Sequence, residues 1–442
     1  MCGILAYYSN HQVISLQIFI ENLKKLHHRG QDSVGVSYFD QGILKSITCK
    51  TFEELINKTQ LLSSKYILGH TKYTTSGDKN NSIDQPIMSK NSLGDYCLIY
   101  NGNIPINNYF ETNNYSNDTM MILDFLNNNS RKYTKWKDLL EYFVFKFERA
   151  FNIIIQTKDT FYIMKDKHGV RPLTYTFYKT SNTFMFSSES CVFQNNQYIH
   201  EIPAGTLYGL NKYGFKELIN YPKLFEKHCL FEYIYFLNKD SIFENTTVKS
   251  YRSEIGKLMA KRDKIFFKGL KKDFIVCGIP NTGNDYAESY ADEIGYDNKD
   301  YILKNSEVSR TFILSNNEER NKYANVKYLF DKNIKNKNII IIDDSVVRGI
   351  TLKNLIRNLK EFGVLSIYAV IASPPINNKC NYGIDIPTKE ELIINKISEK
   401  DLHKYFGCER IKYLDLSLLN KALPDYFNKC TMCLNPNPNL EW

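Results

Sequence analysis

The spacing of apolar and polar residues changes near residue 220 and divides the chain into two parts. In the first part, short apolar or alternating runs are bounded by Asn, Gly, Asp and Ser, which is the pattern of antiparallel strands. These runs lie at residues 66–74, 97–102, 150–166 and 183–190. Residues 15–30 and 118–127 repeat apolar side chains at helical spacing. The pattern predicts a layered α+β domain with helices packed over antiparallel sheets.

From about residue 245, predicted strands alternate with predicted helices. A helix is expected over residues 247–270. Strands follow at 273–280, 338–344 and 366–373, and helices at 284–295 and 351–363. This alternation is typical of a parallel, doubly wound α/β sheet, whose ligands bind at the carboxyl ends of the strands. We therefore predict two domains, at residues 2–224 and 225–442.

Composition narrows the class of protein. The 442 residues are 43% hydrophobic, enough to fill two or three cores. The formal charge of +9 reflects Lys spread along the chain, including the segment "NNNSRKYTKWKD". A positive field favours phosphate-bearing ligands. The chain shows neither an aromatic-interleaved basic stripe nor zinc-finger spacing, so we expect no nucleic-acid partner.

The sequence also bears on compartment. No apolar run reaches the ~18 residues that cross a bilayer, and the first 20 residues do not resemble a secretion signal. We expect a soluble cytoplasmic protein with no membrane partner. In such a compartment, ten cysteines indicate reduced thiols, metal ligation or catalysis before disulfides.

The chain begins "MCGILAYY", which places a cysteine directly behind the initiator. Cysteine is often a small buried hydrophobe, so an ordinary N-terminal strand is one interpretation. The chemical interpretation is that removal of Met1 gives Cys2 a thiol and a free α-amine. Because that amine titrates near pH ~7.7 to 8.0, it can take the thiol proton.

Four isoleucines at residues 339–342 run directly into Asp343 and Asp344, and a predicted helix follows. Backbone N–H groups at a helix start bind phosphate. The two carboxylates would repel phosphate, so they suit sugar hydroxyls or a divalent cation. A Rossmann-type nucleotide loop and a merely solvated aspartate pair are the alternatives, although the GxGxxG fingerprint is missing.

The loop "IIIIDDSVVRGIT" resembles the phosphoribosyl diphosphate (PRPP) loop of type I phosphoribosyltransferases. Other segments, in order along the chain, are "MCGI", "HRGQDSVGV", "GHTKYTTSG", "YNGNI", "KHGVRPL", "SSES", "FEYIYF", "KNSEVSRTFI" and "PPINNKCNYGIDIPTKEELI". Together they resemble the glutamine PRPP amidotransferase family. The resemblance implies an N-terminal-nucleophile (Ntn) glutaminase domain followed by a type I phosphoribosyltransferase domain.

The implied reaction releases ammonia from glutamine and transfers it to C1 of PRPP. The products are 5-phosphoribosylamine, glutamate and pyrophosphate, in the first step of de novo purine synthesis. The resemblance also implies purine nucleotides as feedback inhibitors and a homotetramer.

The resemblance assigns the glutaminase residues. Cys2 is the nucleophile, and Asn101 with Gly102 forms the oxyanion hole, although "YNGNI" is also compatible with a hairpin turn. Asp118 is expected to pair with the α-amine of glutamine, and Arg29 to help build the pocket. Lys72 stands where the family has an arginine for the α-carboxylate. Because lysine offers a point charge instead of a planar fork, we expect a raised glutamine KM.

The resemblance also assigns the transferase residues. Asp343 and Asp344 are expected to contact ribose and Mg²⁺, with Thr282 near the metal. Around the phosphates we expect Ser345, Arg348, Gly349, Thr351, Lys304, Arg310 and Lys327. Each cation is alternatively a solvated surface charge. Three departures from the family pattern, Asn281, Ile350 and Asn325, would remove polar contacts near PRPP.

Four cysteines match positions that hold a [4Fe-4S] cluster in some family members. They are Cys229, Cys380, Cys430 and Cys433. Unconnected thiols or a zinc site are the alternatives.

Two other functions remain open at this stage. One is a different Ntn amidotransferase, such as glucosamine-phosphate or asparagine synthase, against which the "DDSVVRG" loop argues. The other is a non-catalytic regulator that keeps the PRPP fold as a nucleotide sensor.

Overall fold

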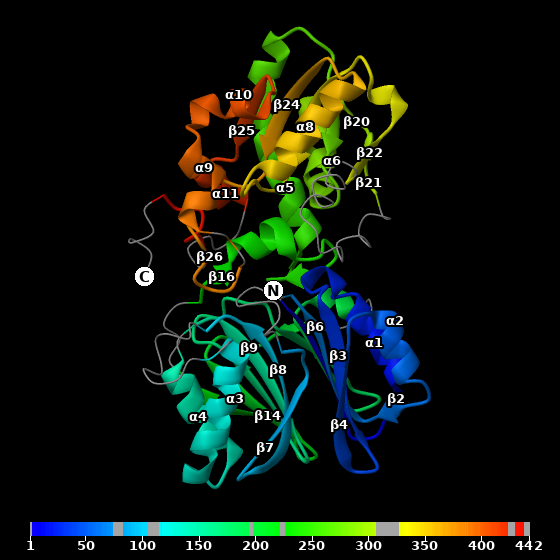
Figure 1. The fold of residues 1–442 in the computed structure, drawn as a ribbon, viewed down its shortest axis with the longest axis vertical. Coiled ribbons are helices and arrows are strands. Elements are labelled where there is room, and N and C mark those ends of the chain that lie inside the picture. Colours follow the sequence, from blue (N-terminus) through cyan, green and yellow to red (C-terminus); the bar gives the residue numbers. More distant parts are fainter. Residues whose placement is uncertain are drawn as a thin grey trace.

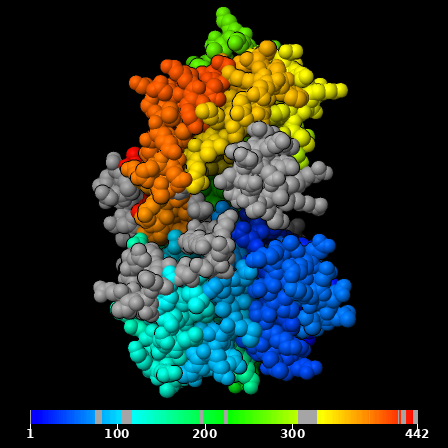
Figure 2. Space-filling model, viewed as in Figure 1, coloured from blue at the N-terminus to red at the C-terminus, as the bar shows by residue number. Residues whose placement is uncertain are grey.

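The structure is a computed structural model, and it describes residues 2–73, 83–104, 115, 117–147, 149–193, 198–221, 226–305, 327–384, 386, 388–422 and 429–436. Figure 1 shows two parts stacked along the long axis, with the N-terminus at their junction. In Figure 2, the blue and cyan segments form one mass and the yellow and orange segments form another. The expected boundary at residue 224 lies outside the described residues.

Two antiparallel sheets form the centre of the first part. The first has the order β13-β11-β12-β1-β6-β3-β4, with β1 (Gly3–Ser9), β3 (Ser33–Asp40), β4 (Ile43–Cys49), β6 (Tyr66–Lys72), β11 (Thr174–Tyr178), β12 (Thr183–Ser187) and β13 (His200–Glu201). The second has the order β15-β14-β10-β9-β8-β7, with β7 (Ile87–Asn91), β8 (Gly94–Gly102), β9 (Phe151–Thr157), β10 (Phe161–Lys165), β14 (Thr206–Asn211) and β15 (Gly214–Asn220).

Helices cover the outer faces of these sheets. Alternate residues of β1 point to opposite faces. Leu5 packs with helix α1 (Leu16–Lys24) and with Leu55 of α2 (Phe52–Lys58). Ile4 packs instead between the two sheets. Helices α3 (Asp118–Asn129) and α4 (Trp136–Lys146) cover the second sheet. The predicted α+β layers are thereby confirmed as four: helix, sheet, sheet, helix.

One predicted helix is shorter than expected. The pattern over residues 15–30 predicts one helix, but α1 ends at Lys24 and a 3₁₀ turn follows at His27–Arg29. The turn aims Arg29 inward, where two buried carboxylates bind it. These tertiary ion pairs override the local apolar spacing.

The second part is a parallel sheet of order β20-β19-β23-β24-β25. Its strands are β19 (Ile275–Gly278), β20 (Asp297–Asn298), β23 (Asn338–Asp343), β24 (Ser366–Ile371) and β25 (Arg410–Tyr413). Ile340 and Ile342 pack against α5 (Val248–Gly269) and α6 (Thr282–Ile294). Ile339 and Ile341 pack on the other face, against α8 (Ile350–Phe362) and α10 (Leu402–Phe406). Burial on both faces confirms the doubly wound prediction.

Shorter elements complete the described chain. They are β2 (Ile14–Ser15) with β5 (Ser63–Ser64), β17 (Ile242–Phe243) with β18 (Thr246–Thr247), β21 (Ile302–Lys304) with β22 (Tyr328–Phe330), β16 (His228–Cys229) with β26 (Lys429–Cys430), a π-helical turn at Glu232–Phe236, α9 (Ile393–Lys396) and α11 (Leu416–Ala422). None of the helices in the described ranges combines the length and apolar character needed to cross a membrane.

Candidate active sites

Cys2 lies immediately before β1 (Gly3–Ser9), near the N-terminal end of the chain that Figure 1 marks at the junction of the two parts. Its backbone N–H donates to Asn101 Oδ1 at 3.1 Å, and its Sγ lies 3.8 Å from the carbonyl oxygen of Tyr73. Burial alone would raise the thiol pKa, but His70, the N-terminal charge and Tyr73 outweigh it and lower the pKa of Cys2 to about 7. A large fraction of the thiol is therefore ionised at neutral pH, as a nucleophilic cysteine requires.

Asn101 and Gly102 end β8, one sheet away from β1. They pair with Asn152 and Phe151 of β9, so the alternative of a hairpin turn at this pair is wrong. A Cβ on Gly102 would lie 2.5 Å from the carbonyl oxygen of Ala150, which excludes any larger residue here. The Asn101 Nδ2 group is buried, and no described residue forms a hydrogen bond with it. A buried donor left unpaired beside a thiol is what a developing oxyanion requires.

Arg29 lies beneath Cys2 and is fully engaged by protein groups. Its Nε donates to the Cys2 carbonyl oxygen at 3.2 Å. Its other nitrogens donate to Glu189 at 2.5 Å and to Glu232 at 3.0 and 3.1 Å. Although burial raises the pKa of Glu189, the charges of His28 and Arg29 hold it well below its usual range. Arg29 thus positions the backbone of the nucleophile.

The Arg29 network continues into the second part of the chain. Arg171 donates to Glu232 Oε1 at 3.2 Å and to the carbonyl oxygen of Tyr382. The backbone N–H of Tyr382 in turn lies 3.3 Å from the Cys380 sulfur. A series of buried and partly buried hydrogen bonds therefore runs from the Cys2 carbonyl to Tyr382 and Cys380.

Lys72 ends β6 and is 7% exposed. Its ammonium donates to the Ile83 carbonyl oxygen and lies 3.6 Å from Asp84. Burial lowers the pKa of Lys72, while Asp84 and Cys2 act in the opposite direction. The lysine thus lies within electrostatic range of the nucleophile, as its predicted role requires.

Asp118 is the first residue of α3 and is 9% exposed. It accepts hydrogen bonds from the Tyr100 hydroxyl at 3.0 Å and from the backbone N–H of Ile104 at 3.3 Å. Burial raises the pKa of its carboxyl. Tyr100 interacts electrostatically with both Asp118 and Cys2, so it lies between them.

The second site begins where β23 ends. Burial, followed by the charge of Asp344, raises the pKa of Asp343 well above its usual range, and burial also raises the pKa of Asp344. Mg²⁺ is typically held by one or two carboxylates together with substrate phosphates. Two adjacent carboxylates with raised pKa values, Asp343 partly buried and Asp344 buried, therefore fit that ion.

The loop after the aspartates opens helix α8. Ser345 donates to Asp344 Oδ1 at 2.7 Å. Gly349 has φ of +78°, and a Cβ there would lie 3.0 Å from the Phe406 ring, so glycine is required for both reasons. Thr351 is exposed in the first turn of α8. Arg348 is exposed and donates to Glu391 at 3.2 Å, so any ligand contact competes with this ion pair.

Two lysines of the antiparallel pair β21–β22 lie near Asp343 and Asp344. Lys304 is in β21, and Lys327 directly precedes β22. Burial lowers the pKa of Lys327, Lys304 lowers it further, and Asp343 and Asp344 act in the opposite direction. The structure therefore brings these two cations together with the paired carboxylates. The predicted Arg310 and the departure Asn325 lie outside the described residues.

Thr282 is the first residue of α6. This helix follows β19, the strand adjacent to β23 in the sheet. Gly283 packs so closely on β23 that a Cβ would lie 2.4 Å from the Ile342 carbonyl oxygen. This contact places the start of α6 against the carboxyl end of β23. Asn281 and Ile350, both departures from the family pattern, are exposed.

The four predicted cluster cysteines come from three segments. β16 and β26 pair in parallel with Cys229 opposite Cys430. Burial, then the charges of Cys380, Cys229 and Cys430, raises the pKa of Cys433 well above its usual range. The backbone N–H groups of Tyr382 and Ile384 lie 3.3 and 3.4 Å from the Cys380 sulfur.

These features fit a sulfur-ligated group. Hydrogen bonds from backbone amides to sulfur are typical of iron–sulfur sites. Within the described ranges, no three His, Cys, Asp or Glu side chains are close enough together to hold a single metal ion.

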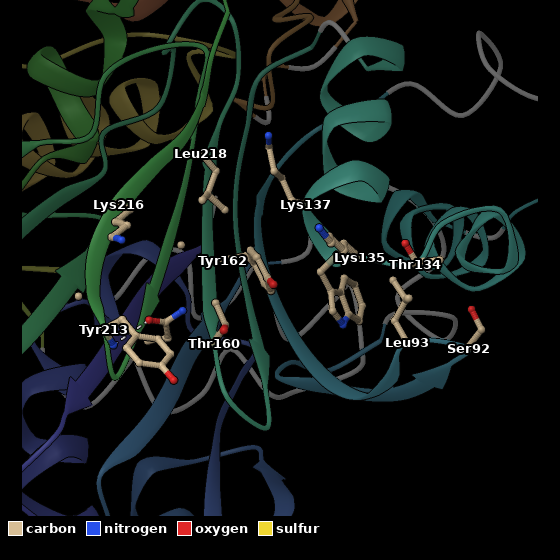
Figure 3. Close-up of a pocket in the computed structure, with 14 residues that line it drawn as sticks. Ser92, Leu93, Thr134, Lys135, Lys137, Thr160, Tyr162, Tyr213, Lys216 and Leu218 are labelled. Carbon is tan, nitrogen blue, oxygen red and sulfur yellow. Dashed lines mark hydrogen bonds between the residues drawn. The ribbon is translucent and has the colours of Figure 1, made fainter.

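A separate open pocket of about 660 Å³ lies at the far side of the second sheet. Figure 3 shows Tyr162 and Leu218 between Lys216 on one side and Lys137 on the other. None of the predicted site residues within the described ranges lines it.

Sequence reasoning missed the buried partners of the predicted residues. His70 lies in the predicted strand at residues 66–74, on the same face as Lys72, and this alternation was the available signal. Glu232 is a carboxylate within the aromatic segment "FEYIYF", and buried charges are rare without partners. No local pattern pointed to Arg29 and Arg171 as the partners of Glu232, or to Glu189 as a second partner of Arg29.

Comparisons with known proteins agree with this geometry. Residues 70–195 match the family model described as the glutamine amidotransferase domain. The amidophosphoribosyltransferase of Archaeoglobus fulgidus is 28% identical over 450 residues, covering 98% of this chain and 96% of that protein. The amidophosphoribosyltransferase of Staphylococcus aureus is 29% identical over 442 residues, covering 96% and 86%.

The solved structure of glutamine PRPP amidotransferase from B. subtilis, complexed with ADP and GMP, superposes with a TM-score of 0.85. It is 25% identical and covers 98% of this chain and 96% of its own. A second structure, of an allosteric regulatory enzyme of purine biosynthesis, has the same TM-score and identity. With both domains and both candidate sites in the same order along one polypeptide, the chain is similar over nearly its whole length to glutamine PRPP amidotransferases.

Proposed function

We propose that the chain is an amidophosphoribosyltransferase that hydrolyses glutamine at Cys2 and transfers the ammonia to C1 of PRPP. One observation carries this proposal. A single chain combines a thiol of pKa about 7 beside an unpaired amide donor with a paired-carboxylate loop at the carboxyl end of a parallel sheet. The "DDSVVRG" loop also favours this family over other Ntn amidotransferases.

In the glutaminase half, removal of Met1 would expose the α-amine of Cys2. The thiolate attacks the side-chain amide of glutamine, and Asn101 Nδ2 with the Gly102 N–H stabilises the oxyanion. Asp118 pairs with the α-amine of glutamine and Lys72 with its α-carboxylate. Arg29 holds the Cys2 carbonyl so that the sulfur stays aimed at the pocket.

In the transferase half, ammonia displaces pyrophosphate at C1 of the ribose. Asp343 and Asp344 bind the ribose and Mg²⁺, with Thr282 nearby. When bound, the ion neutralises charge that develops on the leaving pyrophosphate. The phosphates lie among Ser345, Arg348, Gly349, Thr351, Lys304, Arg310 and Lys327.

Ammonia must pass between the sites without protonation by bulk water. We place Tyr235 on that route because, besides burial, the charges of Asp344 and Asp343, and the hydroxyl of Tyr73, all act on its hydroxyl and raise its pKa. It therefore lies within range of the PRPP loop and of the residue whose carbonyl faces Cys2.

The test supplies purified protein with glutamine, PRPP and Mg²⁺ and follows glutamate and pyrophosphate. The proposal expects both products in equal amounts. Neither product would indicate a non-catalytic regulator, and glutamate alone would indicate a transferase site that has lost activity.

We also propose a [4Fe-4S] cluster held by Cys229, Cys380, Cys430 and Cys433, which would fasten the β26 segment to β16. Anaerobically purified protein should then absorb broadly near about 400 nm. A colourless preparation with zinc or no metal would contradict the cluster. Purine-nucleotide feedback, a homotetramer and cytoplasmic location are further proposals, the first supported by the ADP and GMP bound to the B. subtilis protein.

A further inference from the structure

A buried histidine faces the nucleophile from the neighbouring strand. His70 lies in β6 and is 0% exposed. It pairs with Ile4 of β1, and Cys2 precedes Ile4 by two residues. Because alternate residues of a strand share a face, the side chains of His70 and Cys2 lie on the same side of the sheet.

The hydrogen bonding of His70 fixes its tautomer. Nε2 lies 3.1 Å from the carbonyl oxygen of Tyr100, which belongs to the facing sheet. A carbonyl oxygen can only accept, so Nε2 carries the hydrogen and the neutral ring presents a lone pair at Nδ1. That Nδ1 atom is buried and has no hydrogen-bond partner among the residues that the structure describes. A buried acceptor without a partner is rare and requires an explanation.

The Cys2 thiol is the proton donor close to this ring. His70 is close enough to this thiol to contribute to lowering its pKa. The other groups around the thiol are cationic or neutral: Lys72 on the same strand, Arg29 at the Cys2 carbonyl, and Tyr100 on β8, whose hydroxyl leads away to Asp118. Each nearby cation favours a thiolate, and of these neighbouring side chains the neutral imidazole is the one that offers a lone pair to the proton.

We propose that His70 Nδ1 accepts the thiol proton of Cys2 and is a second base for the glutaminase reaction, beside the terminal amine. This inference rests on the proposed function. The S–H bond breaks and an Nδ1–H bond forms, which leaves a thiolate beside an imidazolium whose Nε2–H still donates to Tyr100.

The remaining steps balance with water as the co-reactant. The sulfur electron pair forms the C–S bond to the side-chain carbonyl carbon of glutamine. The proton on Nδ1 then passes to the amide nitrogen, the C–N bond breaks, and ammonia leaves a thioester. Water cleaves the thioester to glutamate and restores the thiol.

A substitution can separate the acceptor at Nδ1 from the donor at Nε2. His70→Gln places an amide N–H near the Nε2 position, which keeps a donor for Tyr100 but removes the Nδ1 lone pair. His200→Gln is the matched control, because His200 is an exposed histidine stacked on Tyr175 in the same sheet. The probe is iodoacetamide, and the readout is the rate of Cys2 alkylation against pH, followed by mass spectrometry.

We expect an alkylation midpoint near pH 7 in the unsubstituted and His200→Gln proteins. In His70→Gln the midpoint should rise by about one pH unit or more, and glutamine-dependent kcat should fall about 10²-fold, the usual size of a general-base effect. Ammonia-dependent synthesis should stay within about twofold. An unchanged midpoint together with unchanged glutamine-dependent kcat would overturn the proposal and leave His70 as a tie between sheets.

A second measurement needs no His70 variant. A chain that retains Met1 lacks the amine on Cys2 but keeps His70, so its alkylation midpoint should stay near pH 7. A rise toward the ordinary thiol value would assign the proton to the terminal amine and overturn the inference. If the unsubstituted protein hydrolyses no glutamine, the proposed function fails, whereas the alkylation profile still decides the role of His70.

Discussion

The glutaminase site and the PRPP loop differ in how their charges are balanced. Around Cys2, cations and a histidine lower the thiol pKa, and Arg29 is neutralised by Glu189 and Glu232. At the end of β23, burial raises the pKa of two adjacent carboxylates, and the charge of Asp344 raises that of Asp343 further. At the first site, protein groups by themselves lower the pKa of the nucleophilic thiol. In the second site the charged forms of the two carboxylates are disfavoured, and a bound cation would relieve this.

The largest effect is expected at the nucleophile. Cys2→Ala should lower glutamine-dependent synthesis by about 10³-fold or more, because the covalent route is lost. Ammonia-dependent synthesis should change less than about twofold, since the PRPP loop is untouched. Assays with each nitrogen source check this, with Cys191→Ala as a control at another partly buried cysteine. Equal loss with both sources would show that the two sites are not separable.

The next largest effect is expected at the aspartate pair. Asp343→Asn should lower synthesis from both nitrogen sources by about 10²-fold, through loss of ribose and cation contacts. Asp331→Asn is the control, because Asp331 is a carboxylate that caps a 3₁₀ turn away from the loop.

The same substitution should stabilise the ligand-free protein. The pKa of Asp343 is raised in the folded state, so its contribution favours folding at low pH and is lost as pH rises through the folded pKa. At pH 8 without Mg²⁺ or PRPP, Asp343→Asn should therefore raise Tm by about 2 °C. A Tm that falls in scanning calorimetry would contradict the described repulsion.

The buried network between the two parts should respond in stability. Glu232→Gln leaves Arg29 and Arg171 with a neutral partner, and breaking a buried ion pair costs about 3–5 kcal/mol. We expect Tm to fall by roughly 5 °C or more. Glu53→Gln, at an exposed first-turn position of α2, should change Tm by less than about 1 °C.

The smallest effect is expected at Lys72. Lys72→Arg restores a planar fork for the glutamine α-carboxylate and should lower glutamine KM by a few-fold, with kcat little changed. Lys50→Arg is the matched control, because Lys50 also pairs with Asp84 but is exposed. An unchanged or higher KM in Lys72→Arg would count against a role for this residue in substrate binding.

Much of the fold was predictable because its signals are local. Strand alternation before residue 220 and the strand–helix alternation after 245 gave the two fold classes, and the isoleucine run gave a strand buried on both faces. The helix predicted over residues 15–30 was too long, because Arg29 is held by carboxylates 160 and 203 residues away. No window of sequence contains those partners.

In the candidate sites, too, some features follow from local sequence and others depend on distant residues. The sequence by itself placed Cys2 at the start of a strand and Asp343 and Asp344 at the end of one, because both positions follow from short runs of residues. Tertiary structure alone decided that His70 Nδ1 and Asn101 Nδ2 are buried without partners near that thiol, and that Glu232 joins Arg29 to Arg171. These arrangements depend on strands of two sheets and on contacts between the two parts. These groups are far apart in the sequence and interact only after folding brings them together. Their interactions are strong because they are buried away from water, so no short segment of sequence could predict them.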